Sequence, residues 1–156
     1  MVEKLLNQNI DCITFDSIKT RYYIEEKSFS CHGAIRFWVD YKKPFEFRGL
    51  VTEESNTIEC KIVQADVSKI SESEIMLVHS DSAISKIHVF VVNDSFNSIH
   101  ALLFDINNQS IDKLTQILIY QDPFGHDLVL FLTCDESYIS DYLNRISKFT
   151  SEIILA

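Results

Sequence analysis

Short polar clusters divide this chain into apolar segments at intervals of about ten residues, a spacing typical of antiparallel β-proteins in which each strand ends at a turn. Two segments, residues 34–42 and 57–66, alternate apolar and polar side chains. Such alternation directs the apolar side chains to one face of a strand. Residues 86–93 and 98–106 are more uniformly apolar, as expected for central strands that are covered on both faces. The pattern therefore predicts a mainly antiparallel, meander-like β-sheet.

The strongest local signal is a hairpin over residues 117–131. Two apolar runs flank the sequence Asp122-Pro-Phe-Gly, which has the residues preferred at the first, second and last positions of a type I turn. Gly125 can adopt the left-handed conformation that such a connection uses. We therefore expect neighbouring antiparallel strands on the two sides of this turn.

An amphipathic helix is expected after the hairpin. Thr133 and Glu136 have the spacing of a capping box, in which two side chains satisfy backbone N–H groups at a helix N-terminus. Residues 151–156 form a final short strand or an apolar tail, and residues 2–8 can form a short N-terminal helix. The predicted fold class is α+β, an antiparallel sheet with one C-terminal amphipathic helix packed on it. The helix has apolar residues at three- and four-residue spacing, which gives one apolar face: Tyr138, Ile139, Tyr142, Leu143, Ile146 and Phe149.

The length of 156 residues predicts a single compact domain over residues 1–156, with a core large enough to need no disulfide or structural metal. The four cysteines include no C-x-x-C pair, and we expect free thiols in or near the core. The N-terminus has no apolar signal-peptide core, and no apolar run approaches the ~20 residues that span a bilayer. We therefore expect a cytoplasmic protein that does not bind a membrane.

The five histidines do not have the spacing of a metal site, because none is paired at positions i and i+4 around a carboxylate. A hairpin centred on residues 95–96 would place His88 opposite Leu103 and His100 opposite Val91. The two imidazoles would then lie on opposite faces of the sheet, where they cannot share a metal ion. A register change of one residue would reverse that arrangement. The pattern predicts no metal site.

Cys134 is the strongest candidate nucleophile, since it occupies the first position of the expected helix. A helix N-terminus favours the thiolate, but Asp135 and Glu136 follow immediately and their negative charge opposes it. The chain also contains no Gly-rich phosphate loop and no G-x-S-x-G motif. We therefore expect an inert thiol, no catalytic residues and no cofactor, and so a protein that is not an enzyme.

Charge is distributed unevenly along the chain, whose net charge is −9. Residues 1–61 contain ten acidic and nine basic residues, whereas residues 62–156 contain thirteen acidic and five basic residues. Such clustering is typical of a docking surface that steers a basic partner. The alternative is that negative charge keeps the protein soluble and that Asp is common in turns. The residues predicted to form the interface are Asp105, Asp112, Asp122 and Asp127.

A second stretch, residues 19–48, interleaves seven basic residues with eight aromatic ones, as proteins that bind single-stranded nucleic acid do. Trp38 falls on the polar side of its expected strand, where an exposed indole could anchor a protein partner. Ordinary cross-strand pairing of aromatic and charged residues explains the same pattern. The net negative charge of the chain disfavours nucleic acid as a partner.

These observations together predict a non-catalytic protein-binding module. In its size, its acidity and its lack of catalytic motifs, the chain resembles bacterial immunity proteins, which block basic nuclease-type toxins by covering their substrate surface. The resemblance implies neutralisation of a basic toxin or of another basic protein. One alternative is a β-rich small-molecule-binding protein or small enzyme whose site is assembled only in the tertiary fold. Another is a homo-oligomer that pairs through residues 152–155.

Overall fold

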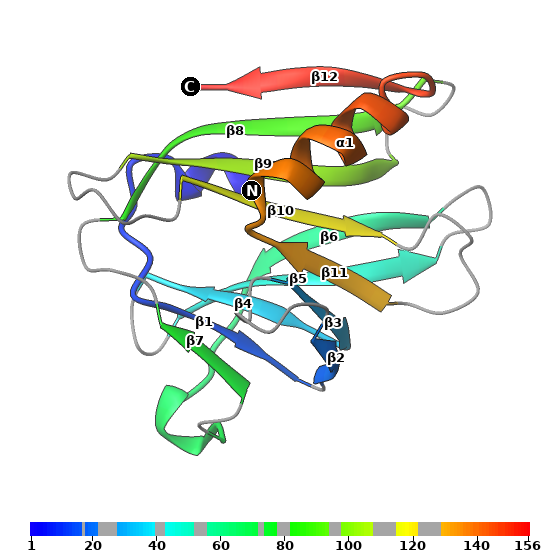
Figure 1. Ribbon diagram of the computed structural model, residues 1–156. Helices are drawn as coiled ribbons and strands as arrows, with labels where there is room; N and C mark the ends of the chain where they lie inside the picture. Colours follow the sequence, from blue (N-terminus) through cyan, green and yellow to red (C-terminus); the bar gives the residue numbers. More distant parts are fainter. Residues whose placement is uncertain are drawn as a thin grey trace.

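Twelve β-strands and one α-helix form the described part of the chain (Figure 1). The computed structural model describes residues 1–16, 18–21, 28–39, 43–51, 56–71, 74–77, 82–93, 98–107, 115–121 and 129–156. The strands are β1 (Cys12–Phe15), β2 (Ile18–Arg21), β3 (Ser28–His32), β4 (Ile35–Trp38), β5 (Phe45–Val51), β6 (Asn56–Ile62), β7 (Ile75–Leu77), β8 (Ala83–Val92), β9 (Ile99–Asn107), β10 (Gln116–Gln121), β11 (Val129–Thr133) and β12 (Thr150–Leu155). The α-helix α1 spans Glu136–Ile146, and two 3-10 helices, η1 and η2, span Val2–Leu5 and Val67–Lys69.

The strands form two sheets, and every described strand pair is antiparallel. The five-stranded sheet has the order β6-β5-β4-β1-β7, and the seven-stranded sheet has the order β12-β8-β9-β10-β11-β3-β2. Consecutive strands β8 to β11 form a meander, whereas β12 and β3 join its two sides from distant parts of the chain. The predicted α+β class, with antiparallel sheet and one C-terminal helix, is confirmed.

The predicted hairpin over residues 117–131 appears as strands β10 and β11. Leu118 pairs with Thr133 and Gln121 pairs with Leu130, so both apolar runs are paired in one continuous register. The turn residues 122–128, which include Gly125, lie outside the described residues. The paired strands are thus confirmed.

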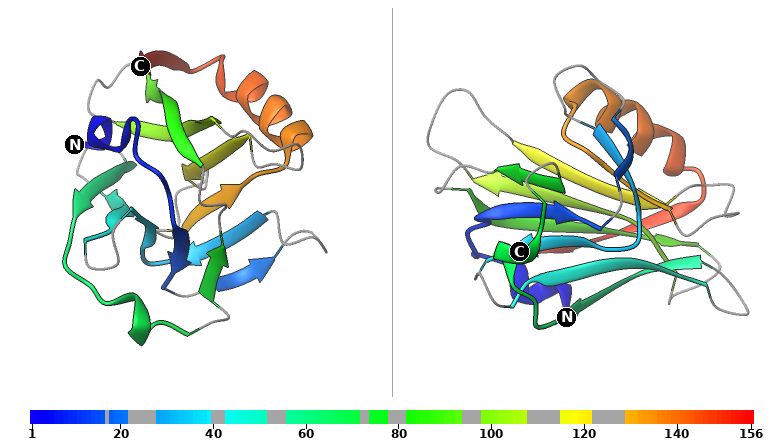
Figure 2. Two further views of the ribbon diagram at one scale, coloured as in Figure 1. Left: turned by 90° about the vertical axis from the view of Figure 1, so that its left-hand side faces the viewer. Right: turned by 90° about the horizontal axis from the view of Figure 1, so that it is seen from below.

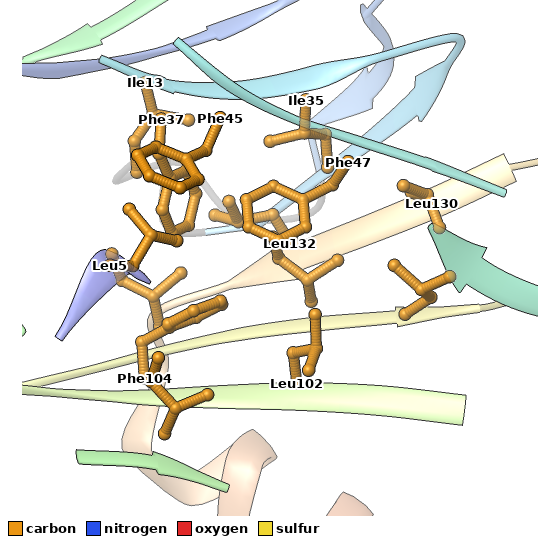
Figure 3. Packing of buried hydrophobic residues seen from close by; sticks show 14 of the residues in the cluster. Leu5, Ile13, Ile35, Phe37, Phe45, Phe47, Leu102, Phe104, Leu130 and Leu132 are labelled. Atoms are coloured by element: carbon orange, nitrogen blue, oxygen red, sulfur yellow. The ribbon is translucent and has the colours of Figure 1, made fainter. Parts of the chain in front are cut away.

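The main core lies between the two sheets, which pack face to face (Figure 3). Phe104 of the seven-stranded sheet contacts Phe37 and Phe47 of the five-stranded sheet, with ring centroids 5.0 and 5.7 Å apart. The expected alternation holds in β4, because Ile35 and Phe37 are fully buried in this core while Arg36 between them faces the other way. Burial of these large side chains supplies the main driving force for packing one sheet on the other.

The helix α1 packs on the outer face of the seven-stranded sheet and forms a second, smaller core there (Figure 2). Its buried residues Ile139, Tyr142 and Ile146 belong to the face predicted from their spacing. The predicted capping box is wrong, because Thr133 is the last residue of β11 and its hydroxyl lies 2.6 Å from that of Ser28.

Asp135 is the N-cap of α1. Its carboxylate accepts hydrogen bonds from the backbone N–H groups of Ser137 and Tyr138, at 3.1 and 3.3 Å. Strand β11 continues through Thr133, so the first helical residue is Glu136 and Cys134 lies before the cap. Tertiary pairing of β11 therefore decides where the helix begins.

The N-terminal end of the chain differs from the expectation, and the C-terminal end matches the expected short strand. The N-terminal residues form a single 3-10 turn over Val2–Leu5, in place of a helix through Gln8, and Leu5 is fully buried in the main core. The C-terminal segment forms β12, which pairs with β8 at the edge of the seven-stranded sheet.

Candidate functional site

Of the four aspartates predicted to form an acidic interface, Asp105 lies in the described part of the chain. It is on β9, and its side chain is 27% exposed. Asp112 falls within residues 108–114, and Asp122 and Asp127 fall within residues 122–128, both outside the described residues. The role of these four residues at an interface stays a prediction.

Strand β10 separates the points at which those two acidic segments join the sheet. Residues 108–114 connect the end of β9 to β10, and residues 122–128 connect the end of β10 to β11. Strand β10 has six residues, and a strand rises about 3.3 Å per residue, so the two attachment points lie about 20 Å apart. The described strand ends that flank residues 108–114 and those that flank residues 122–128 therefore lie at opposite ends of β10.

Asp105 belongs to a cluster with His88 and Glu152, which we call the His88 cluster. Nε2 of His88 lies 2.8 Å from Oδ2 of Asp105, and Nδ1 of His88 contacts Oε1 of Glu152. Gln116 donates from its amide nitrogen to the second oxygen of Asp105, at 2.9 Å. Together with Gln116, the His88 cluster therefore connects four neighbouring strands, β12, β8, β9 and β10.

The protonation state of His88 follows from this geometry. A neutral imidazole has one N–H group, so it can donate to only one of the two carboxylates, whereas an imidazolium can donate to both. Burial lowers the pKa of His88, but the hydrogen bonds to Asp105 and Glu152 outweigh burial and raise it above its ordinary value. The side chain is 15% exposed, so solvent reaches the cluster and can exchange protons with it.

Five carboxylates of the second half of the chain form no ion pair with Lys or Arg within the described residues: Glu74, Asp105, Glu136, Asp141 and Glu152. Glu136 and Asp141 are exposed on α1. The helix also carries Arg145, but its guanidinium lies over the rings of Tyr138 and Tyr142, 5.9 and 5.5 Å from their centroids. A protonated His88 compensates part of the charge of Asp105 and Glu152, whereas Glu136 and Asp141 have no such cationic neighbour among the described residues.

Two arginines of the basic stretch of the first half, Arg36 and Arg48, are compensated internally. Arg36 and Arg48 each pair with both Asp16 and Glu46, and the four side chains form one network on the outer face of the five-stranded sheet. Asp16 also accepts a hydrogen bond from the backbone N–H of Ala34, at 3.0 Å. Two of the bases that the sequence places in a nucleic-acid-binding pattern are thus neutralised within the fold.

Trp38 is not the exposed aromatic anchor that the alternation predicts. Its side chain is fully buried, and its indole N–H donates to the hydroxyl of Thr14 on the neighbouring strand β1, at 2.8 Å. Trp38 points to the face of β4 that the alternation predicts, but that face of the five-stranded sheet is covered at this position. The prediction of an exposed indole is wrong, because the polarity of the flanking residues does not reveal what packs over a strand.

His100 lies on the same face of the seven-stranded sheet as His88, so the predicted opposite placement is wrong. Strands β8 and β9 pair His88 with Leu103 as expected, but the register shifts between Phe90 and Val91, and Val91 pairs with Ile99. This β-bulge leaves His100 as the extra residue and turns its ring toward α1. Nε2 of His100 lies 2.6 Å from the hydroxyl of Tyr142, and burial lowers the pKa of His100.

No group of three or more His, Cys, Asp or Glu side chains among the described residues could hold a metal ion. His79 and His126 lie outside those residues. Of the three described histidines of the seven-stranded sheet, His88 and His100 have hydrogen-bond partners within the fold, and His32 is the last residue of β3.

The four cysteines all lie in described strands or beside them, and none forms a disulfide. Cys12 and Cys31 are buried, and Cys60 and Cys134 are half-buried. Burial raises the pKa of the Cys60 thiol to about 12, and burial beside Asp11 raises the pKa of Cys12. Two of the thiols are thus held in the protonated, unreactive form.

Sequence reasoning missed the His88 cluster, although one signal for it was present. The correct pairing of His88 with Leu103 already puts Asp105, two residues further along β9, on the same face as His88. Glu152 could not be found in this way, because it is 64 positions from His88 and depends on the pairing of β12 with β8.

Across the described ranges, no helix has the length and apolar character needed to cross a membrane. Comparison of the chain with protein families, with curated proteins and with solved structures found no match.

Proposed function

We propose that this protein is a non-catalytic module that binds a basic protein in the cytoplasm, as an acidic inhibitor in the manner of immunity proteins. The partner is a basic toxin domain of the nuclease type or another basic protein.

One observation supports the proposal: the described charged side chains of the two halves of the chain differ in whether they have oppositely charged neighbours. Arg36 and Arg48 are neutralised by acidic neighbours, whereas Glu136 and Asp141 are exposed on α1 without a Lys or Arg ion pair in the described part. Uncompensated carboxylates on one side of a protein steer a cationic partner toward that side and repel polyanions.

The surroundings of His88 and His100 support a role without catalysis for these two histidines. A general base needs a ring nitrogen within reach of a substrate proton. Both ring nitrogens of His88 contact carboxylates, and His100 is buried against Tyr142. These two side chains therefore serve the fold.

Affinity capture with charge-reversed protein tests the proposal. The wild-type protein and the double variant Glu136→Lys, Asp141→Lys are immobilised, exposed to lysate of the source cells, washed in low and then high salt, and the retained proteins are identified by mass spectrometry. We expect one basic protein that is retained by the wild type at low salt and released at high salt. The charge-reversed variant should retain it about tenfold less, since interfacial charge mainly sets association rate and salt dependence.

A matched control separates a local interface from total charge. The double variant Glu3→Lys, Glu59→Lys changes the net charge by the same amount on residues of the first half, and it should retain the basic protein as the wild type does. Thermal unfolding of both variants verifies that they are folded. Capture of no protein by the wild type, or equal retention by Glu136→Lys, Asp141→Lys, would contradict the proposal.

A further inference from the structure

Strand β12 forms an open edge of the seven-stranded sheet. It pairs with β8 on one side and is the last strand in the sheet order, and no described segment lies beyond it in Figure 1. Ile153 and Ile154 are 50% and 54% exposed. An edge strand presents backbone N–H and C=O groups that can pair with another extended chain.

The direction of each backbone group on β12 follows from one hydrogen bond. The N–H of Asn93 donates to the carbonyl of Phe149, at 3.0 Å, immediately before the first pair of β8 and β12. Hydrogen-bonded and non-hydrogen-bonded pairs alternate along an antiparallel ladder. Ser151, Ile153 and Leu155 therefore bond to β8, and the backbone groups of Glu152 and Ile154 point outward.

A second hydrogen bond supports this alternation. The N–H of Val92 donates to the carbonyl of Ser98, toward β9, at 3.0 Å. Val92 and Asn93 are adjacent, so their N–H groups point to opposite sides of β8. The same alternation points the backbone N–H groups of Val91 and Val89 toward β12, where these residues pair with Ser151 and Ile153.

The features that normally protect an edge strand from pairing are weak on β12. Its sequence, TSEIIL, has no proline and one charged residue, and its pairing with β8 has no register shift. Edge strands in monomeric proteins are usually interrupted by a bulge, a proline or several charges. Strand β12 is thus regular enough to accept a further strand.

The charge of the side chains beside β12 determines which kind of strand can pair with this edge of the sheet. Glu152 is 43% exposed, and one of its carboxylate oxygens contacts His88, which also contacts Asp105. Two carboxylates therefore share the single positive charge of a protonated His88, and this face of the sheet keeps a net negative charge beside β12. A second copy of this chain fits poorly in the antiparallel register centred on Glu152, because that register places the two Glu152 side chains opposite each other. Like charges directly opposite destabilise a strand pair, whereas Lys or Arg opposite Glu152 stabilises it.

We infer that β12 binds an extended basic segment of the protein partner, which adds to the seven-stranded sheet as an eighth strand. The outward backbone groups of Glu152 and Ile154 provide the hydrogen bonds, and the carboxylate of Glu152 selects a segment with alternating Lys or Arg. This inference rests on the proposed function for the identity of the partner, and it adds the mode of binding.

Amide hydrogen exchange, measured by NMR with and without the heptapeptide Lys-Val-Lys-Val-Lys-Val-Lys, tests the inference directly. In the free protein the amides of Ser151 and Ile153 should exchange slowly and those of Glu152 and Ile154 quickly. Saturating peptide should slow exchange at Glu152 and Ile154 by about tenfold or more. The peptide Glu-Val-Glu-Val-Glu-Val-Glu should have no such effect.

Three outcomes would overturn the inference. The first is unchanged exchange at Glu152 and Ile154 with the lysine peptide, and the second is equal slowing by the glutamate peptide. The third is protection of these amides in the free protein that grows with protein concentration, because that result assigns the edge to a second copy of the chain.

Two variants at one position separate backbone pairing from side-chain contact. Ile154→Pro removes an outward N–H group and leaves the bonds to β8 in place, so it should weaken binding of the lysine peptide by about tenfold. Ile154→Ala keeps the N–H group and should bind within about threefold of wild type, by the same reasoning. Equal affinity of Ile154→Pro and wild type would overturn the inference.

The same variants distinguish this inference from the proposed function. If Ile154→Pro captures the basic protein as well as the wild type does, the proposed function stands and binding at β12 is wrong. If the wild type captures no protein while the lysine peptide protects Glu152 and Ile154, the proposed function fails and the strand-binding edge stands.

Discussion

Nε2 of His88 on β8 lies 2.8 Å from Oδ2 of Asp105 on β9. Because Nδ1 of the same ring contacts Glu152 on β12, the imidazole joins three strands through its two nitrogens. Both carboxylates accept a hydrogen bond from the ring only when both ring nitrogens are protonated. The stability of the edge of the seven-stranded sheet should therefore depend on pH near neutrality.

The first prediction concerns His88→Gln. The folded-state pKa of His88 is raised above the ordinary value, so its contribution to stability is present in full below the unfolded-state pKa and is lost as the pH rises through the folded-state pKa. At pH 6 the variant should be about 1.5–3 kcal/mol less stable than wild type, the value of a hydrogen bond to a charged group. At pH 9 the difference should be smaller. Urea unfolding at both pH values measures it.

Glu152→Gln is the control for this pH dependence. It retains a hydrogen-bond acceptor for Nδ1 of His88 but removes one of the two charges that favour the imidazolium. The stability of this variant should change less between pH 6 and pH 9 than that of the wild type. A pH dependence equal to that of wild type would contradict the role given to Glu152.

The second prediction concerns the buried pair Trp38 and Thr14. Thr14→Val leaves the indole N–H without its acceptor in a fully buried site, so it should cost about 1–3 kcal/mol of unfolding free energy. Trp38→Phe should cost a similar amount. The double variant should cost less than the sum of the two single changes, because both remove the same hydrogen bond. Additive effects in denaturant unfolding would show that the bond contributes little.

The third prediction compares the two arginines of the network on the five-stranded sheet. The side chain of Arg36 is 15% exposed and that of Arg48 is 43% exposed, although both pair with Asp16 and Glu46. Arg36→Met should therefore destabilise the protein by about 3 kcal/mol, as expected when a buried pair loses one partner. Arg48→Met should cost under about 1 kcal/mol. Equal costs in thermal or urea unfolding would refute the distinction.

The fourth prediction locates the start of α1. Asp135→Ala removes the carboxylate that accepts from Ser137 and Tyr138, and it should cost about 1 kcal/mol, the typical value of an N-cap. Ser140→Ala, at an exposed position inside the helix, changes no cap and serves as the control. Circular dichroism during urea unfolding measures both. A stable Asp135→Ala variant would place the cap elsewhere.

Local sequence patterns were sufficient to determine the elements whose physics is local. The alternation of Ile35 and Phe37 with Arg36 identified the core face of β4, and the two apolar runs around residues 122–128 identified the pairing of β10 with β11. The spacing of Ile139, Tyr142 and Ile146 identified the buried face of α1. Each of these features depends on side-chain periodicity, which is a property of neighbouring residues.

The first residue of α1 and the position of His100 depended on strand pairing. Thr133 is held in β11, where its hydroxyl contacts Ser28, so it cannot serve as the helix cap. A single bulge opposite Phe90 and Val91 moves His100 to the face that carries His88. A shift of one residue reverses the face of a side chain, and no local pattern marked that bulge.

The sequence by itself determined the antiparallel β architecture, the C-terminal helix and the excess of negative charge in the second half of the chain. Only the tertiary structure decided the burial of Trp38 against Thr14, the neutralisation of Arg36 by Asp16, and the meeting of His88 with Glu152. The physical reason is separation along the chain. Periodicity reports which way a side chain points, whereas burial and charge pairing depend on distant segments that the fold brings to it.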